Sequence, residues 1–267
     1  MKKPQSSANL YGIHVANIIL EQQPEVIVNL YVQDSFKKTT NKSDNINNDR
    51  INNIIHLAND YGLAINYLPK IKLDQLADNV QHQGVVVQCK ANTVLRVKGE
   101  DELKSFYQDK IDSDADRKFF ILILDGIQDP HNLGACIRSA EALGVDCVIV
   151  PQNNSVGLTS TVCKISSGAA LLLPVFQVVN LSRTINWLKE QGVWVYGTEM
   201  VSDTKLSDLD LKGSSALVMG AEGTGMRKLT SSLCDQIFTI PMAGNTESLN
   251  VSVATGICLY EVVRQRS

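Results

Sequence analysis

The chain has 267 residues, enough for two domains of ordinary size, and 44% of them are apolar, as in a soluble globular protein. Its net charge of −3, with no broad basic excess in either half, excludes nucleic-acid binding through a global positive field. No apolar run reaches membrane-spanning length, and the six cysteines stand singly without a Cys-x-x-Cys pair, which argues against a membrane span, a metal site and a disulfide framework. We therefore expect a cytoplasmic protein.

The first ninety residues are predicted to form a small α/β domain. Their apolar residues follow helical spacing in some stretches and form short β-rich runs in others. The predicted elements are a helix over 10–20, a strand over 26–32, a helix from Ile51 to Ala58 ended by Gly62, a strand over 64–68, a helix over 72–80 and a strand over 84–89.

A charged stretch, residues 91–117, is predicted to be a linker with one weakly amphipathic helix, and residues 118–267 form a second domain. Predicted strands at 119–124, 147–150, 193–197, 216–219 and 236–242 alternate with helices such as 133–143 and 181–188. This alternation indicates a mostly parallel sheet covered on both faces. In such sheets ligands bind beyond the carboxyl ends of the strands.

The first polar cluster follows the strand at 119–124. Asn132 is a candidate N-cap of the next helix, and Arg138 lies three residues before Glu141, close enough for an ion pair. A surface salt bridge explains the pair as well as a functional site does.

A glycine loop, Gly220-x-x-Gly223-x-Gly225, follows the strand at 216–219. Glycine permits close approach of backbone to a ligand. The spacing does not match a dinucleotide fingerprint, and the loop lacks the lysine of a phosphate-binding P-loop. A nucleotide-dependent oxidoreductase is therefore disfavoured.

The third cluster, residues 240–256, places polar side chains between a strand and a helix expected to begin at Leu249. Gly244 and Asn245 indicate a turn, and backbone N–H groups at the helix start favour a binding site. Helix capping by Ser248 or Asn250 is the alternative explanation.

In this order, the three clusters resemble the three motifs of the SpoU (TrmH-like) ribose 2′-O-methyltransferases of the SPOUT superfamily. The motifs are Gln128-Asp-Pro-His-Asn-Leu-Gly-Ala with Ile137-Arg-Ser-Ala-Glu141, Met219-Gly-Ala-Glu-Gly223, and Ile240-Pro-Met with Glu247-Ser-Leu-Asn-Val-Ser252. Tyr11-Gly-Ile-His-Val and His82-Gln-Gly-Val-Val resemble the L30e-like RNA-binding domain of the branch that methylates a guanosine in the peptidyl-transferase P loop of 23S ribosomal RNA.

The resemblance implies an α/β fold with a small L30e-like amino-terminal domain at 1–90 and a SPOUT domain whose mostly parallel sheet carries a deep carboxyl-terminal trefoil knot. It implies S-adenosylmethionine as methyl donor without a metal, a homodimer, and 23S rRNA or an assembly intermediate as partner, with no membrane. Backbone groups around Gly220, Ile240, Met242 and Leu249 are expected to contact the cofactor.

Arg138 is by resemblance the residue nearest the methyl transfer. Because a guanidinium stays protonated, we expect it to stabilise the forming alkoxide or its phosphate neighbour rather than to act as a base. Asn132, Glu222, Ser248 and Asn250 would orient it, and a Glu222–Arg138 ion pair is one version of that arrangement. Glu247 is assigned only to helix capping.

RNA contacts are harder to assign from the sequence. The candidates, each equally explained as a solvated surface residue, are Lys37, Lys38, Lys42, Arg50, Lys70, Lys72, Lys90 and Arg96. The competing functions are methylation of another ribosomal or transfer RNA nucleotide and a non-catalytic RNA-binding role in ribosome assembly.

Overall fold

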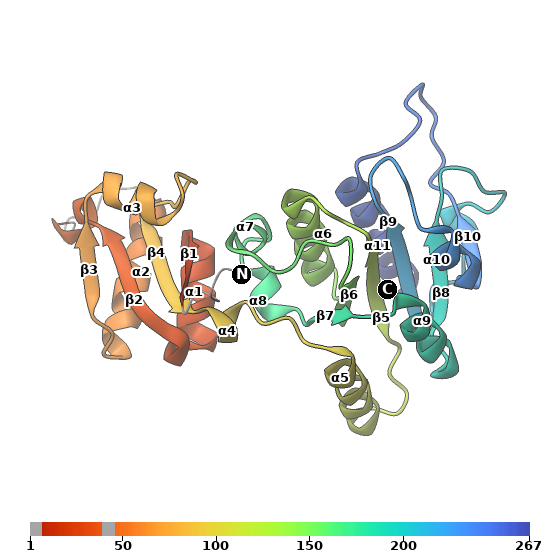
Figure 1. Cartoon of the computed structure of the whole chain (residues 1–267), viewed down its shortest axis with the longest axis horizontal. Helices are drawn as coiled ribbons and strands as arrows, with labels where there is room; N and C mark the ends of the chain where they lie inside the picture. Colours follow the sequence, from red (N-terminus) through yellow and green to blue (C-terminus); the bar gives the residue numbers. More distant parts are fainter. Residues whose placement is uncertain (1–6, 39–45) are drawn as a thin grey trace. The chain divides into compact units, whose positions relative to one another are not determined.

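The computed structural model describes residues 7–38 and 46–267, and the chain divides into two compact units. The first unit contains the described residues up to Arg96 and also Leu158–Leu172, while the second contains Val97–Gly157 and Leu173–Ser267 (Figure 1). Lys42, one of the candidate RNA contacts, lies outside the described residues.

The first unit is built on a four-stranded mixed sheet in the order β1-β4-β2-β3. Strand β4 is antiparallel to both of its neighbours, and β3 is parallel to β2. The elements of this unit are β1 (Ser7–Tyr11), α1 (Ile13–Gln22), β2 (Ile27–Gln33), α2 (Ile46–Asp60), β3 (Ile65–Leu68), α3 (Lys70–Leu76), β4 (Val85–Lys90), α4 (Ala91–Val94), α7 (Ser160–Ile165) and α8 (Ala169–Leu172).

Strand β1 is absent from the sequence-based prediction, which begins a helix at residue 10. Gly12, with φ of 105°, separates β1 from α1, and its backbone conformation is one that residues with a Cβ rarely adopt. The apolar spacing of α1 continues without a break into Leu10 and Tyr11, which are buried strand residues. Periodicity alone therefore predicts one continuous helix where the structure has a strand followed by a helix.

Residues 158–172, expected in the second domain, group with the first unit. Helix α7 packs against β1, and an added Cβ at Gly168 would come within 2.3 Å of Ile18 Cδ1. Only glycine allows this close approach without displacing the Ile18 side chain.

The second unit is built on a six-stranded parallel sheet in the order β10-β8-β9-β5-β6-β7. Its elements are α5 (Glu100–Ser113), β5 (Phe120–Asp125), α6 (Pro130–Ala142), β6 (Cys147–Pro151), β7 (Val175–Val178), α9 (Leu181–Glu190), β8 (Trp194–Thr198), β9 (Ser215–Gly220), α10 (Lys228–Leu233), β10 (Gln236–Phe238) and α11 (Val251–Arg266). The sequence correctly predicts a parallel sheet, but it misses β7 and extends β10 to residue 242.

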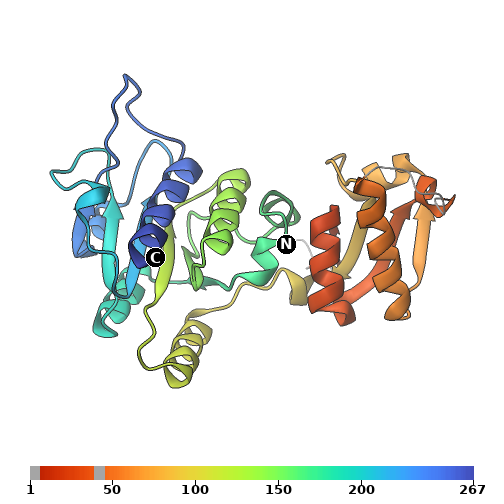
Figure 2. The same ribbon diagram turned by 180° about the vertical axis from the view of Figure 1, so that it is seen from behind.

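Helices cover both faces of this sheet, so every residue of β5 is buried. Ile121 and Ile123 share one core cluster with Tyr107 of α5 and Ile185 of α9. Helices α6 and α11 run side by side over the sheet in the view from behind (Figure 2). A strand buried on both faces reads as a continuous apolar run, which explains the sequence of β5.

Five of the cysteines, Cys89, Cys136, Cys147, Cys163 and Cys258, are buried as free thiols. Burial raises the pKa of Cys89 and of Cys258 to about 12, so both stay protonated and unreactive. In the described part of the chain, no helix is long and apolar enough to cross a membrane, and no three His, Cys, Asp or Glu side chains are grouped as a metal site would require.

Candidate active site

The three motifs meet because the strands before them are close together in one parallel sheet. The first, second and third motifs follow β5, β9 and β10, and in the sheet order β10-β8-β9-β5 these strands are separated only by β8. All four strands point the same way, so their carboxyl ends lie at one edge.

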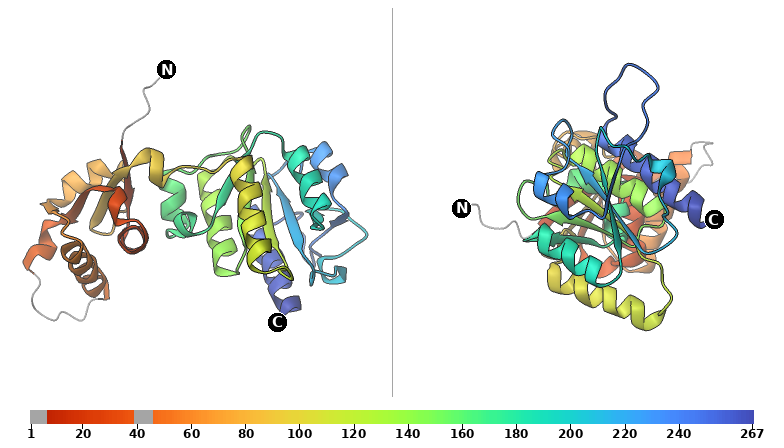
Figure 3. Two further views of the ribbon diagram at one scale, coloured as in Figure 1. Left: turned by 90° about the horizontal axis from the view of Figure 1, so that it is seen from below. Right: turned by 90° about the vertical axis from the view of Figure 1, so that its right-hand side faces the viewer.

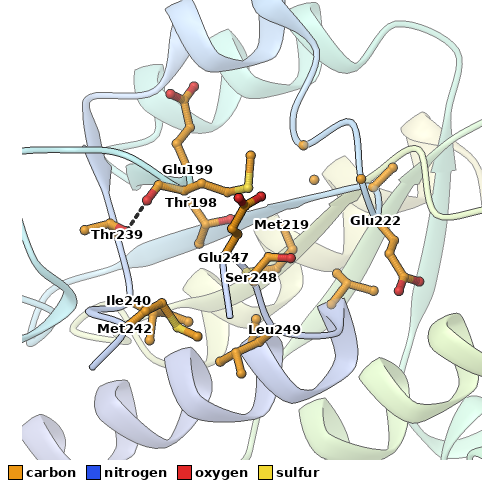
Figure 4. Close-up of a pocket in the computed structure, with 17 residues that line it drawn as sticks. Thr198, Glu199, Met219, Glu222, Thr239, Ile240, Met242, Glu247, Ser248 and Leu249 are labelled. Atoms are coloured by element: carbon orange, nitrogen blue, oxygen red, sulfur yellow. Dashed lines mark hydrogen bonds between the residues drawn. The ribbon is translucent and has the colours of Figure 1, made fainter. Parts of the chain in front are cut away.

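A pocket opens at this edge, and all four residues predicted to contact a cofactor line it: Gly220, Ile240, Met242 and Leu249 (Figure 4). Glu222 and Ser248 line it as well. The apolar part of the wall also includes Met219, Val251 and Ala254.

Gly220 marks a very close approach between two parts of the second motif. An added Cβ there would lie 2.1 Å from the carbonyl carbon of Gly225 and 2.2 Å from the nitrogen of Met226. The loop is closed by two backbone hydrogen bonds between Ala221 and Gly225, of 3.0 and 2.9 Å. The wall of the pocket here is therefore backbone, which a side chain at residue 220 would displace.

A chain of side-chain hydrogen bonds joins the three motifs. The Asn250 Nδ2 donates to Asn132 Oδ1 over 3.0 Å, and Asn132 Nδ2 donates to Glu222 Oε2, also over 3.0 Å. Asn250 is at the same time the N-cap of α11, since its Oδ1 accepts from the backbone N–H of Ser252 at 2.9 Å.

The N-cap role of Asn250 fixes which atoms donate and which accept along this series of hydrogen bonds. Because the Asn250 oxygen is occupied by the helix start, its nitrogen must donate, and Asn132 must accept with its oxygen and donate with its nitrogen. Glu222 is then required as an acceptor, which suits an ionised carboxylate.

This geometry corrects the predicted cap of α6. Asp129, not Asn132, is the N-cap, because its Oδ1 accepts from the backbone N–H of His131 at 2.9 Å. Asn132 lies inside the first turn, where its side chain is available to bridge the other two motifs. Helix α11, expected from Leu249, begins at Val251 with Asn250 as the cap.

Arg138 does not join this network. It is exposed on α6 and does not line the pocket. It does not contact Glu222, which accepts its hydrogen bond from Asn132. Among the described residues neither the Glu222–Arg138 pair nor the Arg138–Glu141 pair forms a salt bridge. The Arg138 guanidinium is therefore available to a bound anion.

The sequence did not indicate the segment after β8. Thr198, Glu199 and Met200 line the pocket because β8 lies between β10 and β9 in the sheet. The sequence does show that these residues directly follow a predicted strand of a parallel sheet, where ligands bind. It does not show the strand order that brings them to the motifs.

Glu247 was expected only to cap a helix, and that expectation is wrong. Asn250 caps α11, while Glu247 lines the pocket. It belongs to an exposed loop, residues 241–248, that projects from the second unit in the right panel of Figure 3 and returns at Ser248 to the pocket.

A second hollow shares Ala221, Glu222 and Gly225 with the pocket and is also lined by Asn132. The buried Asp125 also lines this hollow. It accepts a hydrogen bond from the backbone N–H of Arg227 and forms a 2.9 Å salt bridge with Arg227 Nη2. The Asn132–Glu222 hydrogen bond therefore lies in the lining of the second hollow, and Glu222 also lines the pocket.

Comparison with known proteins gives two family matches. Residues 119–260 match the SpoU rRNA Methylase family, and residues 10–95 match the RNA 2′-O ribose methyltransferase substrate-binding family.

Two curated relatives span nearly the whole chain. One is the 23S rRNA (guanosine-2′-O-)-methyltransferase RlmB of Shewanella oneidensis, 45% identical over 257 residues that cover 96% of this chain and 97% of the relative. The enzyme of the same name from Escherichia coli strain K12 is 42% identical over 261 residues, which cover 98% of this chain and 100% of the relative.

Among solved structures, the SpoU methyltransferase AviRb from Streptomyces viridochromogenes in complex with the cofactor AdoMet has a TM-score of 0.73 at 21% identity. The match covers 98% of this chain and 91% of that one. The TrmH/SpoU tRNA modifying enzyme of A. aeolicus has a TM-score of 0.51 at 27% identity and covers 61% of this chain and 83% of its own. The fold of the chain is thus that of SpoU methyltransferases.

Proposed function

Because the chain belongs to the SpoU rRNA methylase family, we propose that it transfers a methyl group from S-adenosylmethionine to the ribose 2′-hydroxyl of a guanosine in 23S ribosomal RNA. The finer assignment is a guanosine in the peptidyl-transferase P loop, in free rRNA or an assembly intermediate. The observation that supports a catalytic rather than a purely binding role is the Asn250–Asn132–Glu222 hydrogen-bond chain, which ends at Glu222 in the lining of the pocket.

The residues of the pocket suit this cofactor. Met219, Ile240, Met242 and Leu249 offer apolar surface for an adenine ring, and the open backbone at Ile240 and Met242 offers donors and acceptors for its edge. When bound, S-adenosylmethionine supplies an electrophilic methyl group on a cationic sulfur.

The 2′-hydroxyl is a weak nucleophile, so its proton must leave and the charge developing on oxygen must be stabilised. We assign that stabilisation to Arg138, which is exposed and meets an anion only when RNA binds. Asn132 and Glu222 both line the adjoining hollow, and Glu222 lines the cofactor pocket as well, so their proposed role is to orient the ribose there. Asn250 holds the third motif against Asn132 through its hydrogen bond, and we assign Ser248, which lines the pocket, a share in orienting the substrate.

The proposal includes a homodimer. Val253, Ile257 and Tyr260 of α11 are 51%, 39% and 60% exposed and follow the i, i+4, i+7 spacing of one helix face. The opposite face of α11, with Thr255 and Cys258, is buried. An exposed apolar helix face supports association with a second copy. The trefoil knot and a cytoplasmic location complete the proposal.

RNA binding by the first unit is also part of the proposed function. Lys70, Lys72 and Lys90 are exposed, as is Arg50. His82, in the segment His82-Gln-Gly-Val-Val, is instead buried and hydrogen-bonded to Asp74 and to the backbone N–H of Gly84. We therefore assign it a structural role rather than an RNA contact. Phosphate contacts predict binding that weakens steeply with salt.

Mapping ribose methylation in ribosomal RNA from cells with and without the gene tests the function. One guanosine of 23S rRNA, in the P loop, should lose its 2′-O-methyl group in the deleted strain. An unchanged methylation map would refute the proposal, and a lost methyl group elsewhere would refute only the finer assignment.

The role of Arg138 is tested in vitro. Arg138→Ala should abolish methyl transfer and leave S-adenosylmethionine affinity, measured by calorimetry, within about twofold, because the side chain is outside the pocket. Equal loss of binding and transfer would contradict this division of roles.

A further inference from the structure

The cofactor pocket carries three carboxylates, on Glu199, Glu222 and Glu247, and none of its described lining side chains is basic. We propose that Glu247 makes this pocket selective for the cationic methyl donor over the reaction product, which is neutral at sulfur. The inference rests on the proposed function and assigns a cofactor-discriminating role within it.

The three carboxylates differ in what they already bind. Glu222 accepts the hydrogen bond from Asn132, and Glu199 accepts one from the hydroxyl of Ser231. Among the described residues, Glu247 has neither a hydrogen-bond nor an ion-pair partner.

Their directions differ as well. Figure 4 shows the Glu247 side chain among the side chains that line the pocket, whereas the Glu199 carboxylate extends away from Ile240 and Leu249. Of the three, Glu247 is therefore the one that faces a bound molecule with its charge uncompensated.

The charge of the ligand changes during the reaction. In S-adenosylmethionine the ammonium and carboxylate groups cancel and the sulfonium adds one positive charge. When the methyl group passes to the 2′-oxygen, the electrons of the S–C bond remain on sulfur and the 2′-hydroxyl proton is released to solvent, so S-adenosylhomocysteine carries a neutral thioether. The attraction between Glu247 and the sulfur is lost in that step.

Glu247 thus favours binding of the donor and exit of the product. Its carboxylate is on an exposed loop, so water screens the attraction and the effect is modest. For one unit charge several ångströms away in a high-dielectric setting, we expect a selectivity of about three- to tenfold.

The test is calorimetric titration of the full-length protein and its Glu247→Gln variant with S-adenosylmethionine, with S-adenosylhomocysteine, and with sinefungin, which carries an amine in place of the methyl sulfonium. Glutamine keeps the shape and removes the charge. The variant should bind S-adenosylmethionine and sinefungin about three- to tenfold more weakly and S-adenosylhomocysteine less than about twofold more weakly.

Two further variants separate local charge from other effects. Glu190→Gln removes an exposed carboxylate at the end of α9, outside the pocket lining, and should change none of the three affinities. Glu199→Gln should have a smaller effect than Glu247→Gln, because its carboxylate is turned away.

Equal weakening of donor and product in Glu247→Gln would overturn the inference, since it would show a packing role for the loop. Unchanged affinities would overturn it too. If the wild-type protein binds S-adenosylmethionine and methylates RNA while the donor-to-product ratio is the same in the variant, only the discriminating role fails. A wild-type protein that does not bind S-adenosylmethionine would remove the proposed function and this role together.

Discussion

Replacing Gly220 by alanine tests whether close backbone packing builds the cofactor pocket. The new Cβ would lie 2.1 Å from the carbonyl carbon of Gly225, 2.2 Å from the nitrogen of Met226 and 2.6 Å from the Gly225 oxygen. All three are backbone atoms, so no side-chain rotation relieves the clash, and the loop that returns from Ala221 to Gly225 must move.

Overpacking of this kind costs about 1–3 kcal/mol, which for a protein of this size lowers the melting temperature by roughly 2–10 °C. The displaced loop also forms the pocket wall, so affinity for S-adenosylmethionine should fall by about tenfold or more, a loss of at least ~1.4 kcal/mol of binding free energy. Scanning calorimetry and isothermal titration measure the two effects separately.

Gly244→Ala is the matched control for Gly220→Ala. Gly244 is in the third cluster, residues 240–256, its φ is not positive, and an added Cβ there meets nothing within 4 Å. This variant should melt and bind as the wild type does. If Gly220→Ala also melts and binds unchanged, the close approach inferred from the structure is wrong.

Three other perturbations follow from the structure. Asn132→Asp removes the N–H donor to Glu222 and sets two carboxylates against each other, so methyl transfer should fall about 10–100-fold with S-adenosylmethionine affinity nearly kept; full activity would show that the bridge is dispensable. Tyr260→Glu places a charge on the exposed face of α11 and should shift the protein from dimer to monomer in sedimentation, whereas an unchanged dimer would place the interface elsewhere. The hydrogen bonds from Arg264 lower the pKa of Glu261 from 4.5 to about 2, so its stabilisation is present above pH 4.5 and is lost as pH falls towards 2; a difference in unfolding free energy between wild type and Glu261→Gln that persists at pH 2 would contradict this.

The sequence determines the second unit best where the signal is short-range. A continuous apolar run predicts β5, because a strand covered on both faces has no polar side, and helical spacing predicts α9. Asn250 was one of two candidate caps of α11, since cap and helix start are adjacent in the chain. Strand β7, with only four residues, was not predicted.

The motif resemblance supplied residues that physical pattern alone did not single out. Gly220, Ile240, Met242 and Leu249 were chosen by resemblance, and the structure brings all four to one pocket. Their contact with a cofactor and the catalytic role of Arg138 remain predictions.

Only the tertiary structure decided how the motifs combine. Asn132 looked like a helix cap from its neighbours, yet it bridges Glu222, 90 residues further along, and Asn250, 118 residues along. Glu199 enters the pocket because β8 lies between β10 and β9, an order that no local pattern contains. Glu247 enters it because the loop after β10 returns to the pocket at Ser248. Periodicity and capping report interactions within a few residues, whereas a site built at the edge of a sheet depends on strand order, which is set by packing across the whole domain.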